Sequence, residues 1–403
     1  MNVLVLSHMF PRNDGDWGGI FVLEQVKALR ARGIETRVFF GDATWHPANS
    51  LWKVPLRPPL RKMRLLRKLP VVPRRWRTIA GVPAASFKFD VSIEPWWGRI
   101  GPLTYALGSL LLARTLASSF LPDIIHAHTS LLDGTAARVL SWWFGKPYII
   151  TEHTGPFSVL TQNPASRRYV RRAVRGAKYF VSVSSHLQNE VLTQLGLSEE
   201  VHRNFVIPNG FDPKVFFPTA MPPAESVKVL WVGAFVEIKQ PLLAIEAFAQ
   251  AAAKNEALSL TMVGAGALEP AMKTKIAELG LSGKVTVRPT LPRSVLAEVM
   301  RSHHYLMVTS KSETFCLVAL EALACGRPVL TTACGGPVDF VGGTGRGMIV
   351  SSNCDELERG MLAMAANLKS YDYASIGSFV LERFSYESVA ERISGLYEQA
   401  VVS

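Results

Sequence analysis

The sequence predicts an α/β protein made of two doubly wound, Rossmann-like domains, and three observations support this prediction. Short apolar runs alternate with segments of helical periodicity along most of the chain. The alternation breaks once, at Val206–Asp212, and then begins again. The length of 403 residues is about twice that of an ordinary domain. Alternating strands and helices form right-handed βαβ units, which build a parallel sheet covered on both faces.

The N-terminal half, residues 1–205, begins with the apolar run VLVLS and continues with the helical spacing of Val22, Val26 and Leu29, which ends near Gly33. The elements that follow are predicted from the same two periodicities, two residues for strands and 3.6 for helices. The predicted strands are Val3–Ser7, Thr36–Phe40, Ile124–Ala127, Tyr148–Glu152 and Phe180–Ser184, and the predicted helices are Phe21–Ala31, 102–119, 132–143 and His186–Leu195.

The second half, residues 206–380, repeats this architecture without repeating the sequence. The predicted strands are Val227–Val232, Leu258–Val263, Val285–Val287, Tyr305–Val308 and Pro328–Thr331, and the predicted helices are 241–254, 269–279, 293–302 and 315–324. Residues 381–403 are expected to form a C-terminal helix that packs back towards the N-terminal domain. Because doubly wound sheets bind ligands at the carboxyl ends of their strands, two such domains predict a site in an interdomain cleft.

The composition excludes several classes of protein. With 48% apolar and 19% charged residues, the chain is not disordered. Four cysteines without a C-x-x-C pair are not a disulfide framework, which favours the cytoplasm. The first residues lack a basic n-region, so they predict a strand rather than a signal peptide. The apolar stretch 102–120 contains Arg114 and small polar residues, so it predicts a buried helix rather than a membrane span.

The formal net charge of +12 comes almost entirely from one segment. Residues 43–89 contain eleven Lys or Arg, seven Pro and no acid, whereas the rest of the chain contains 33 basic and 32 acidic side chains. Bases alternate there with Trp and Leu, which favours contact with an anionic membrane surface; a nucleic-acid contact and a solvated loop are the alternatives, and no nucleic-acid partner is predicted. The expected membrane patch consists of Arg61, Lys62, Arg64, Arg67 and Lys68.

Two glutamates lie eight residues apart after the predicted strand YLMV. Glu313 is expected just before a helix and Glu321 inside it, ~12 Å further along the axis. The free backbone amides of residues 314–316 would form a helix end that binds an anion or a hydroxyl group. The spacing suits the two ends of a long polar ligand, such as two sugar rings flanking a diphosphate. A solvated acidic pair that stabilises the helix dipole is the alternative.

Several motifs together resemble the retaining family-4 glycosyltransferases, which have the two-domain GT-B fold. The stretch with Glu313 and Glu321 resembles their E-x7-E region and continues into ALACGRPV and GGPVDFV. Three motifs that precede this stretch also occur in the family's order: the glycine-rich loop in Pro11–Gly33, the TEHTG motif at Thr151–Gly155 and the segment Val232–Lys239. The resemblance covers nearly the whole chain, and the family members that the chain resembles are bacterial enzymes of cell-surface polysaccharide synthesis.

The resemblance implies roles for individual residues. Glu313 would stabilise positive charge on the donor sugar, Lys239 would neutralise the diphosphate leaving group, and His153 would contact the donor sugar. The other donor-binding residues implied are Gly18 and Gly19, which admit the phosphate, the backbone amides of Thr314, Phe315, Cys316 and Leu317, and Glu321, which would hold the ribose. There are two departures. Ala234 occupies the position of a usual phosphate-binding arginine, with Arg203 or Arg293 as candidate substitutes, and Cys316 replaces a common glycine.

Three further motifs could suggest a metal or a cofactor, but each has a simpler interpretation. His126 and His128 lie on one side of a strand and are expected to face the acceptor, with a structural role as the alternative; they lack Cys or carboxylate partners at zinc-site spacing. Asp14 and Asp16 predict a solvated turn, so no essential metal is expected. The G-x-G at Gly264–Gly266 lacks the third glycine of a dinucleotide site.

The sequence therefore predicts a retaining, metal-independent hexosyltransferase without a cofactor, located in the cytoplasm and peripheral at the inner face of the membrane. It would move a sugar from a nucleoside-diphosphate sugar to a lipid-linked or cell-surface glycan precursor. A non-catalytic protein that binds nucleotide sugars or glycans, and a nucleotide-sugar epimerase, are the alternatives. The sugar, the nucleobase, the linkage and the oligomeric state do not follow from the residues.

Overall fold

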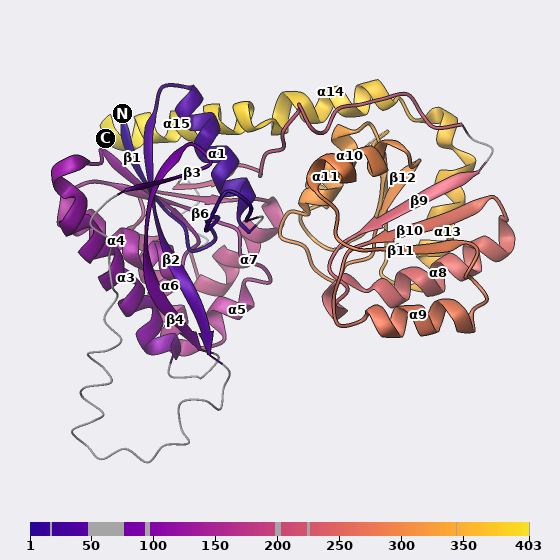
Figure 1. Ribbon diagram of the computed structural model, residues 1–403, viewed down its shortest axis with the longest axis horizontal. Helices are drawn as coiled ribbons and strands as arrows, with labels where there is room; N and C mark the ends of the chain where they lie inside the picture. The colour runs from indigo at the N-terminus through magenta and orange to yellow at the C-terminus, as the bar shows by residue number, and fades with distance from the viewer. Residues whose placement is uncertain are drawn as a thin grey trace, which may run out of the picture. The chain divides into compact units, whose positions relative to one another are not determined.

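The computed structural model describes residues 1–16, 18–46, 76–92, 97–197, 203–223, 226–343 and 345–402, and the chain divides into two compact units. Unit 1 comprises Met1–Val183, Leu187–Pro208 and Val389–Ser403, and unit 2 comprises Ser184–His186 and Asn209–Ser388. Each unit contains one mainly parallel, doubly wound sheet, which confirms the predicted fold class (Figure 1).

Unit 1 has an eight-stranded sheet in the order β3-β4-β2-β1-β5-β6-β7-β8. All neighbouring strands are parallel except β3, which is antiparallel to β4. The strands are β1 (Asn2–Leu6), β2 (Glu35–His46), β3 (Arg77–Ile79), β4 (Val82–Ser92), β5 (Ile124–His128), β6 (Tyr148–Glu152), β7 (Tyr179–Ser182) and β8 (Asn204–Val206). The helices are α1 (Ile20–Ala31), α3 (Trp97–Leu116), α4 (Leu132–Phe144), α5 (Ser158–Thr161), α6 (Pro164–Gly176), α7 (Ser185–Leu195) and α15 (Tyr386–Val402), with a 3₁₀ turn at Ala117–Ser119.

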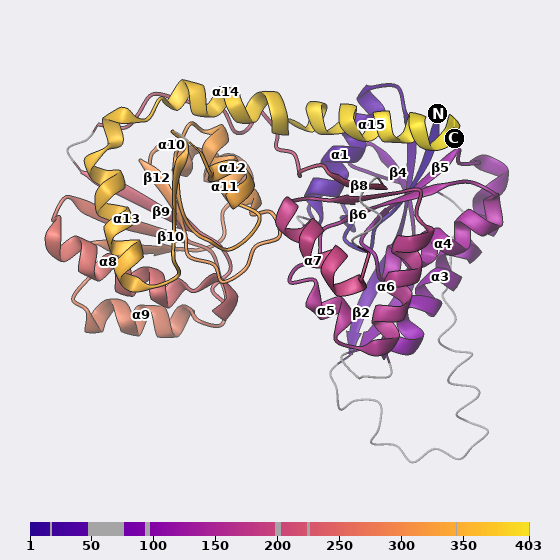
Figure 2. The ribbon, with the colours of Figure 1, turned by 180° about the vertical axis from the view of Figure 1, so that it is seen from behind.

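The two faces of this sheet carry different helices. Helices α1 and α15 pack on one face, where Val26 and Ile393 belong to the same buried cluster as Val5 of β1. Helices α3, α4 and α6 lie side by side on the other face (Figure 2). The C-terminal helix is therefore part of the core of unit 1, and the two chain ends lie near each other.

Unit 2 has a six-stranded parallel sheet in the order β11-β10-β9-β12-β13-β14. The strands are β9 (Val227–Val232), β10 (Leu258–Val263), β11 (Val285–Arg288), β12 (Tyr305–Val308), β13 (Val329–Thr332) and β14 (Gly347–Val350). The helices are α8 (Pro241–Lys254), α9 (Glu269–Glu278), α10 (Arg293–Arg301), α11 (Leu317–Ala324), α12 (Val338–Val341), α13 (Cys354–Ala366) and α14 (Tyr373–Phe384), with 3₁₀ turns at Glu237–Lys239 and Leu368–Ser370.

The structure corrects several predicted elements. Part of the basic segment 43–89 belongs to the sheet, because β2 continues to His46 and β3 and β4 begin at Arg77 and Val82. The expected patch at residues 61–68 lies outside the described residues. The single helix expected at 381–403 is two helices, since the extended backbone of Ser385 separates α14 from α15.

Two helices of unit 1, α5 and α6, were not predicted. Helix α6 contains five arginines among its 13 residues, so its sequence shows only a narrow apolar stripe. That stripe consists of Val170, Ala173 and Val174, which are buried together with Ser166.

The long apolar stretch of unit 1 forms α3. The segment Arg99–Ser119 has the length and hydropathy to cross a membrane, but half of it is buried within the protein. Its Tyr105 is fully buried and donates a hydrogen bond to Asp133 of α4. This helix packs along α4 and β4, as expected of a core helix.

Candidate functional site

The strand order of unit 2 reverses between β9 and β12. From β9 the chain moves outwards through β10 and β11, then returns to place β12 on the other side of β9. Ligands of doubly wound proteins bind at the carboxyl ends of strands at such a reversal. The loop after β9 carries Lys239, and the loop after β12 carries Glu313. Two of the predicted site residues therefore lie at the reversal itself.

Lys239 and Glu313 form an ion pair at this edge. The Nζ atom of Lys239 lies 2.5 Å from Oε1 of Glu313, and Ser310 Oγ donates a second hydrogen bond to the same oxygen at 2.7 Å. The Glu313 side chain is 10% exposed, whereas that of Lys239 is 29% exposed. The backbone of Glu313 is fixed by hydrogen bonds with Cys334 and Gly336. The carboxylate is thus held in place, and the ammonium group remains within reach of a ligand.

Helix α11 begins at Leu317, two residues later than predicted. Cys316 is its N-cap residue and has a φ of +70°, in the left-handed region that favours glycine. The glycine that the family resemblance leads us to expect here would adopt this φ without strain, whereas the cysteine does not. The amides that open the helix therefore belong to Leu317 and Val318, while Thr314 and Phe315 lie in the preceding loop. Burial raises the pKa of the Cys316 thiol well above its usual value, so the thiol stays protonated.

Glu321 lies inside α11 and pairs with an arginine from another helix. Its Oε1 atom is 2.5 Å from Nη2 of Arg293, the first residue of α10, and both side chains are largely buried. Arg293 also lies over the ring of Phe216 at 5.1 Å. Burial raises the pKa of Glu321 to about 7, and the charge of Arg293 opposes this shift. Of the two candidate arginines, Arg293 reaches this site, while Arg203 donates to backbone carbonyls of unit 1.

The glycine-rich loop of unit 1 follows β1 and ends at the start of α1. Gly19 is the N-cap residue, with a φ of +66°. A Cβ atom there would lie 1.5 Å from the Met9 carbonyl oxygen, so only glycine fits. Asp16 accepts backbone hydrogen bonds from Arg12 and Gly18, and the carboxylate thereby shapes the turn.

Asp14 likewise accepts a hydrogen bond from the backbone amide of Ala80. Over the ranges that the structure describes, no three His, Cys, Asp or Glu side chains come together as a metal site.

The predicted histidines of unit 1 lie on adjacent strands. His153 follows β6, and its Nε2 atom is 3.0 Å from Nδ1 of His128 at the end of β5, with the rings stacked. Glu152, the last residue of β6, is fully buried and accepts hydrogen bonds from the amides of Ser130, His153 and Thr154. This carboxylate fixes the loops that follow both strands.

His126 occupies a structural position, not the expected acceptor-facing one. It is completely buried, Nδ1 lies 2.6 Å from the hydroxyl of Tyr397 and Nε2 lies 2.8 Å from that of Thr151. Burial lowers the pKa of His126 to about 3, so the ring is neutral. The physical reason is its place inside β5, where α15 covers the sheet.

Comparison with known proteins identifies the family. The model described as "Glycosyl transferases group 1" matches residues 217–375, and the model described as "Glycosyltransferase Family 4" matches residues 86–215. Together they cover most of both units. The chain belongs to the family-4 glycosyltransferases of the GT-B fold.

Several relatives agree with this assignment. A D-inositol 3-phosphate glycosyltransferase of Stackebrandtia nassauensis is 26% identical, over 96% of this chain and 88% of its own. An uncharacterized glycosyltransferase of Methanocaldococcus jannaschii is 23% identical, over 74% of this chain and 81% of its own. Among solved structures, sucrose-phosphate synthase from Thermosynechococcus elongatus aligns with a TM-score of 0.73 and 21% identity, over 99% of this chain and 98% of its own. HepE of Anabaena in complex with UDP aligns with a TM-score of 0.71 and 17% identity, over 99% and 100%.

The glycosyltransferase also has site features that its sequence did not reveal. His8 follows β1, and its Nδ1 atom lies 2.8 Å from Oδ2 of Asp133, a fully buried carboxylate that also accepts hydrogen bonds from Tyr105 and Thr129. Burial lowers the pKa of His8, but Asp133 and then Glu152 outweigh it, so the pKa is raised. A His directly after the first strand is the one sequence signal for this pair.

Proposed function

We propose that this glycosyltransferase is a retaining enzyme that transfers a hexose from a nucleoside-diphosphate sugar to an acceptor hydroxyl. The observation that carries the proposal is the Lys239–Glu313 pair at the strand-order reversal of unit 2. A lysine there can neutralise a diphosphate, and a fixed carboxylate beside it can stabilise the positive charge that develops on the sugar ring.

In the proposed reaction, the bond between the anomeric carbon and the diphosphate oxygen breaks. The acceptor oxygen bonds to the same carbon on the same face, and its proton passes to the departing diphosphate. No protein base is required, so the residues position the reactants and stabilise charge. Lys239 supplies a positive charge without a metal, and we propose that the enzyme needs no cofactor.

The other site residues would hold the donor. Glu321 would accept hydrogen bonds from the ribose, with Arg293 fixing its orientation at 2.5 Å. The amides at the start of α11 are suited to the sugar and the diphosphate. In unit 1, Gly19 would admit the phosphate, and His153, held by His128 and Glu152, would contact the donor sugar.

The donor and acceptor classes are also part of the proposal. The structural neighbour HepE was solved with UDP and with UDP-glucose, which makes uridine diphosphate sugars the first donors to examine. We propose a lipid-linked or cell-surface glycan precursor as the acceptor, and a cytoplasmic location against an anionic membrane.

The test compares Lys239→Ala and Glu313→Ala with wild type. A thermal-shift screen of nucleoside diphosphates first identifies the base, because a ligand of the native state raises the apparent stability. Release of nucleoside diphosphate from the matching donor is then measured. Loss of one such charge-stabilising group is expected to lower kcat by about 100- to 1000-fold. Lys273→Ala is the control, because it breaks an exposed lysine–glutamate pair of similar length, 2.7 Å, on α9. Near wild-type turnover in both site variants would refute the assignment.

The two alternatives give different results in the same assay. A non-catalytic binding protein would show the thermal shift without releasing nucleoside diphosphate. An epimerase would convert the donor in the absence of any acceptor. The anomeric configuration of the product, read by NMR, distinguishes retention from inversion.

A further inference from the structure

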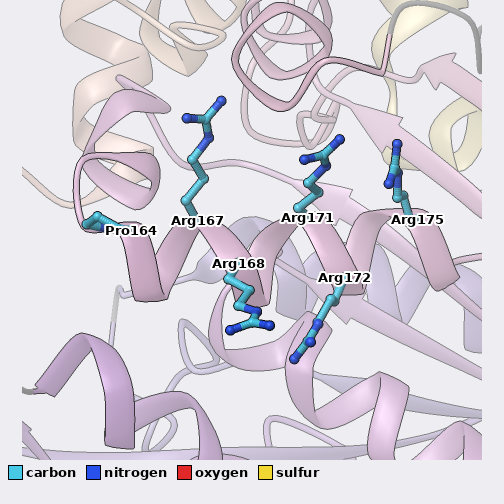
Figure 3. A pocket seen from close by; sticks show the side chains of 6 residues that line it. All are labelled: Pro164, Arg167, Arg168, Arg171, Arg172 and Arg175. Carbon is cyan, nitrogen blue, oxygen red and sulfur yellow. The ribbon is translucent and has the colours of Figure 1, made fainter.

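Helix α6 of unit 1 presents a strongly basic surface that the proposed reaction does not use. Its five arginines are all exposed, while its opposite side is buried against the protein. Arg167, Arg171 and Arg175 point to one side of the helix and Arg168 and Arg172 to the other (Figure 3). Together with Pro164 they line an open cavity of about 440 Å³.

Among the residues that the structure describes, few groups balance the charge of Arg168, Arg171 and Arg172. The helix contains no Asp or Glu. Arg167 donates to the backbone carbonyl of Gln194. Within the described ranges, Arg168, Arg171 and Arg172 have no carboxylate at ion-pairing distance. Since arginines four residues apart on a helix repel each other, an external anionic partner would relieve a repulsion that the fold leaves in place.

Exposed aromatic and aliphatic side chains lie on the helices next to α6. Trp142 and Trp143 at the end of α4 are 82% and 45% exposed, and Leu103 of α3 is 50% exposed. Helix α4 packs directly against α6, and the Arg138 side chain lies beside Gly176, the last residue of α6. Trp142 is one helical turn beyond Arg138, on the same side of α4. The arginines of α6 and the exposed Trp142 therefore lie on neighbouring helices.

We infer that this surface, formed by the α6 arginines and Trp142, docks unit 1 on an anionic lipid bilayer. Arginine binds lipid phosphates in bidentate fashion, and tryptophan inserts at the level of the headgroups. A helix can lie with its axis parallel to the bilayer surface. The guanidinium groups of the arginines then stay in water while the aliphatic parts of their side chains contact lipid. The inference rests on the membrane location proposed above and names the surface that makes the contact, but docking requires neither donor nor turnover, so its failure would leave the proposed reaction untouched.

The experiment measures flotation of the full chain with vesicles of phosphatidylcholine, alone or with one-third phosphatidylglycerol. Wild type is expected to bind only the anionic vesicles and to dissociate as salt rises from about 0.1 M to about 0.5 M. The variant Arg168→Gln/Arg172→Gln removes two charges from α6. At about fivefold per arginine, its partitioning is expected to fall about 25-fold.

The matched control is Lys273→Gln/Arg359→Gln, which removes two exposed cations from helices of unit 2 and gives the same net charge. It is expected to change partitioning less than twofold. An equal loss in both variants would overturn the inference, since net charge alone would then explain binding. Circular dichroism and thermal unfolding confirm that each variant is folded.

Trp142 provides a second, independent readout. Brominated lipid should quench wild-type fluorescence more than that of Trp142→Phe, because Trp142 enters the bilayer. Equal quenching would contradict the proposed orientation. Displacement of the protein from vesicles by duplex RNA at an equal phosphate concentration would assign the surface to nucleic acid and overturn the inference. Binding by Lys239→Ala should equal that of wild type, which separates docking from catalysis.

Discussion

Replacing Gly19 by alanine should damage the site far more than the same change at Gly145, although both glycines have nearly the same φ, +66° and +64°. At Gly145, the C-cap of α4, nothing lies within 4 Å of the added methyl group. That variant therefore bears only the left-handed strain, about 1–2 kcal/mol. At Gly19 the methyl group would lie 1.5 Å from the Met9 carbonyl oxygen, where ordinary contact begins at 3.4 Å. The Met9 carbonyl must therefore retreat by about 2 Å.

This displacement has two measurable consequences. Overpacking adds about 1–3 kcal/mol, so Gly19→Ala should lose roughly 2–5 kcal/mol of unfolding free energy. Because misplacement by 1 Å can cost about 100-fold in rate, turnover should also fall by about that factor or more. Urea unfolding followed by circular dichroism and release of nucleoside diphosphate measure the two effects. If Gly19→Ala matched Gly145→Ala in both stability and turnover, the steric reasoning would be wrong.

Three further predictions follow from buried side chains. Burial raises the pKa of Glu321 in the folded protein to about 7, from an ordinary value of 4.5. Between these two pH values the folded protein holds an extra proton, so its stability falls as the pH rises through them, by about 3 kcal/mol at most. Thermal unfolding at pH 5 and pH 8 should show Glu321→Gln gaining on wild type at the higher pH, and a constant difference would contradict this. Cys316→Gly should change the unfolding free energy by less than about 1 kcal/mol and retain turnover. Cys316→Val should lower the unfolding free energy by about 2 kcal/mol, because a β-branched residue resists a φ of +70°. Equal urea midpoints for the two variants would contradict this prediction. Tyr397→Phe removes the hydroxyl group that His126 Nδ1 contacts in the core, so it should lower the unfolding free energy by about 1–3 kcal/mol. Urea unfolding should show a lower midpoint for unit 1, and an unchanged midpoint would disprove this prediction.

Much of the fold follows from local patterns, and the failures have local causes. Strands β9 to β13 of unit 2 are found almost at their predicted positions, because a buried strand is a nearly continuous apolar run. Strand β14 was not predicted, since only its last residue is buried. Helix α6 was missed because its arginines outnumber the apolar residues that mark its buried side. Strand β4 was assigned to the basic segment because Pro83 and Lys88 obscured the alternation of Phe87 and Phe89.

The candidate site divides in the same way. The loops that carry Lys239, Glu313 and Gly19 could be predicted, because the sequence marks the ends of the strands before them and the starts of the helices after them. The roles of these residues came from the family resemblance and stay a prediction. Cys316 was noted as a departure, but its left-handed φ came only from the structure.

The sequence by itself determined two doubly wound units, the loops that hold the candidate site residues, and the family. Only the tertiary structure decided which side chains meet across these loops. Arg293 reaches Glu321 across 28 residues, His8 reaches Asp133 across 125, and Tyr397 reaches His126 across 271. The physical reason is that periodicity depends on neighbours along the chain, whereas these contacts depend on the order of strands in a sheet and on a C-terminal helix that returns to the first core.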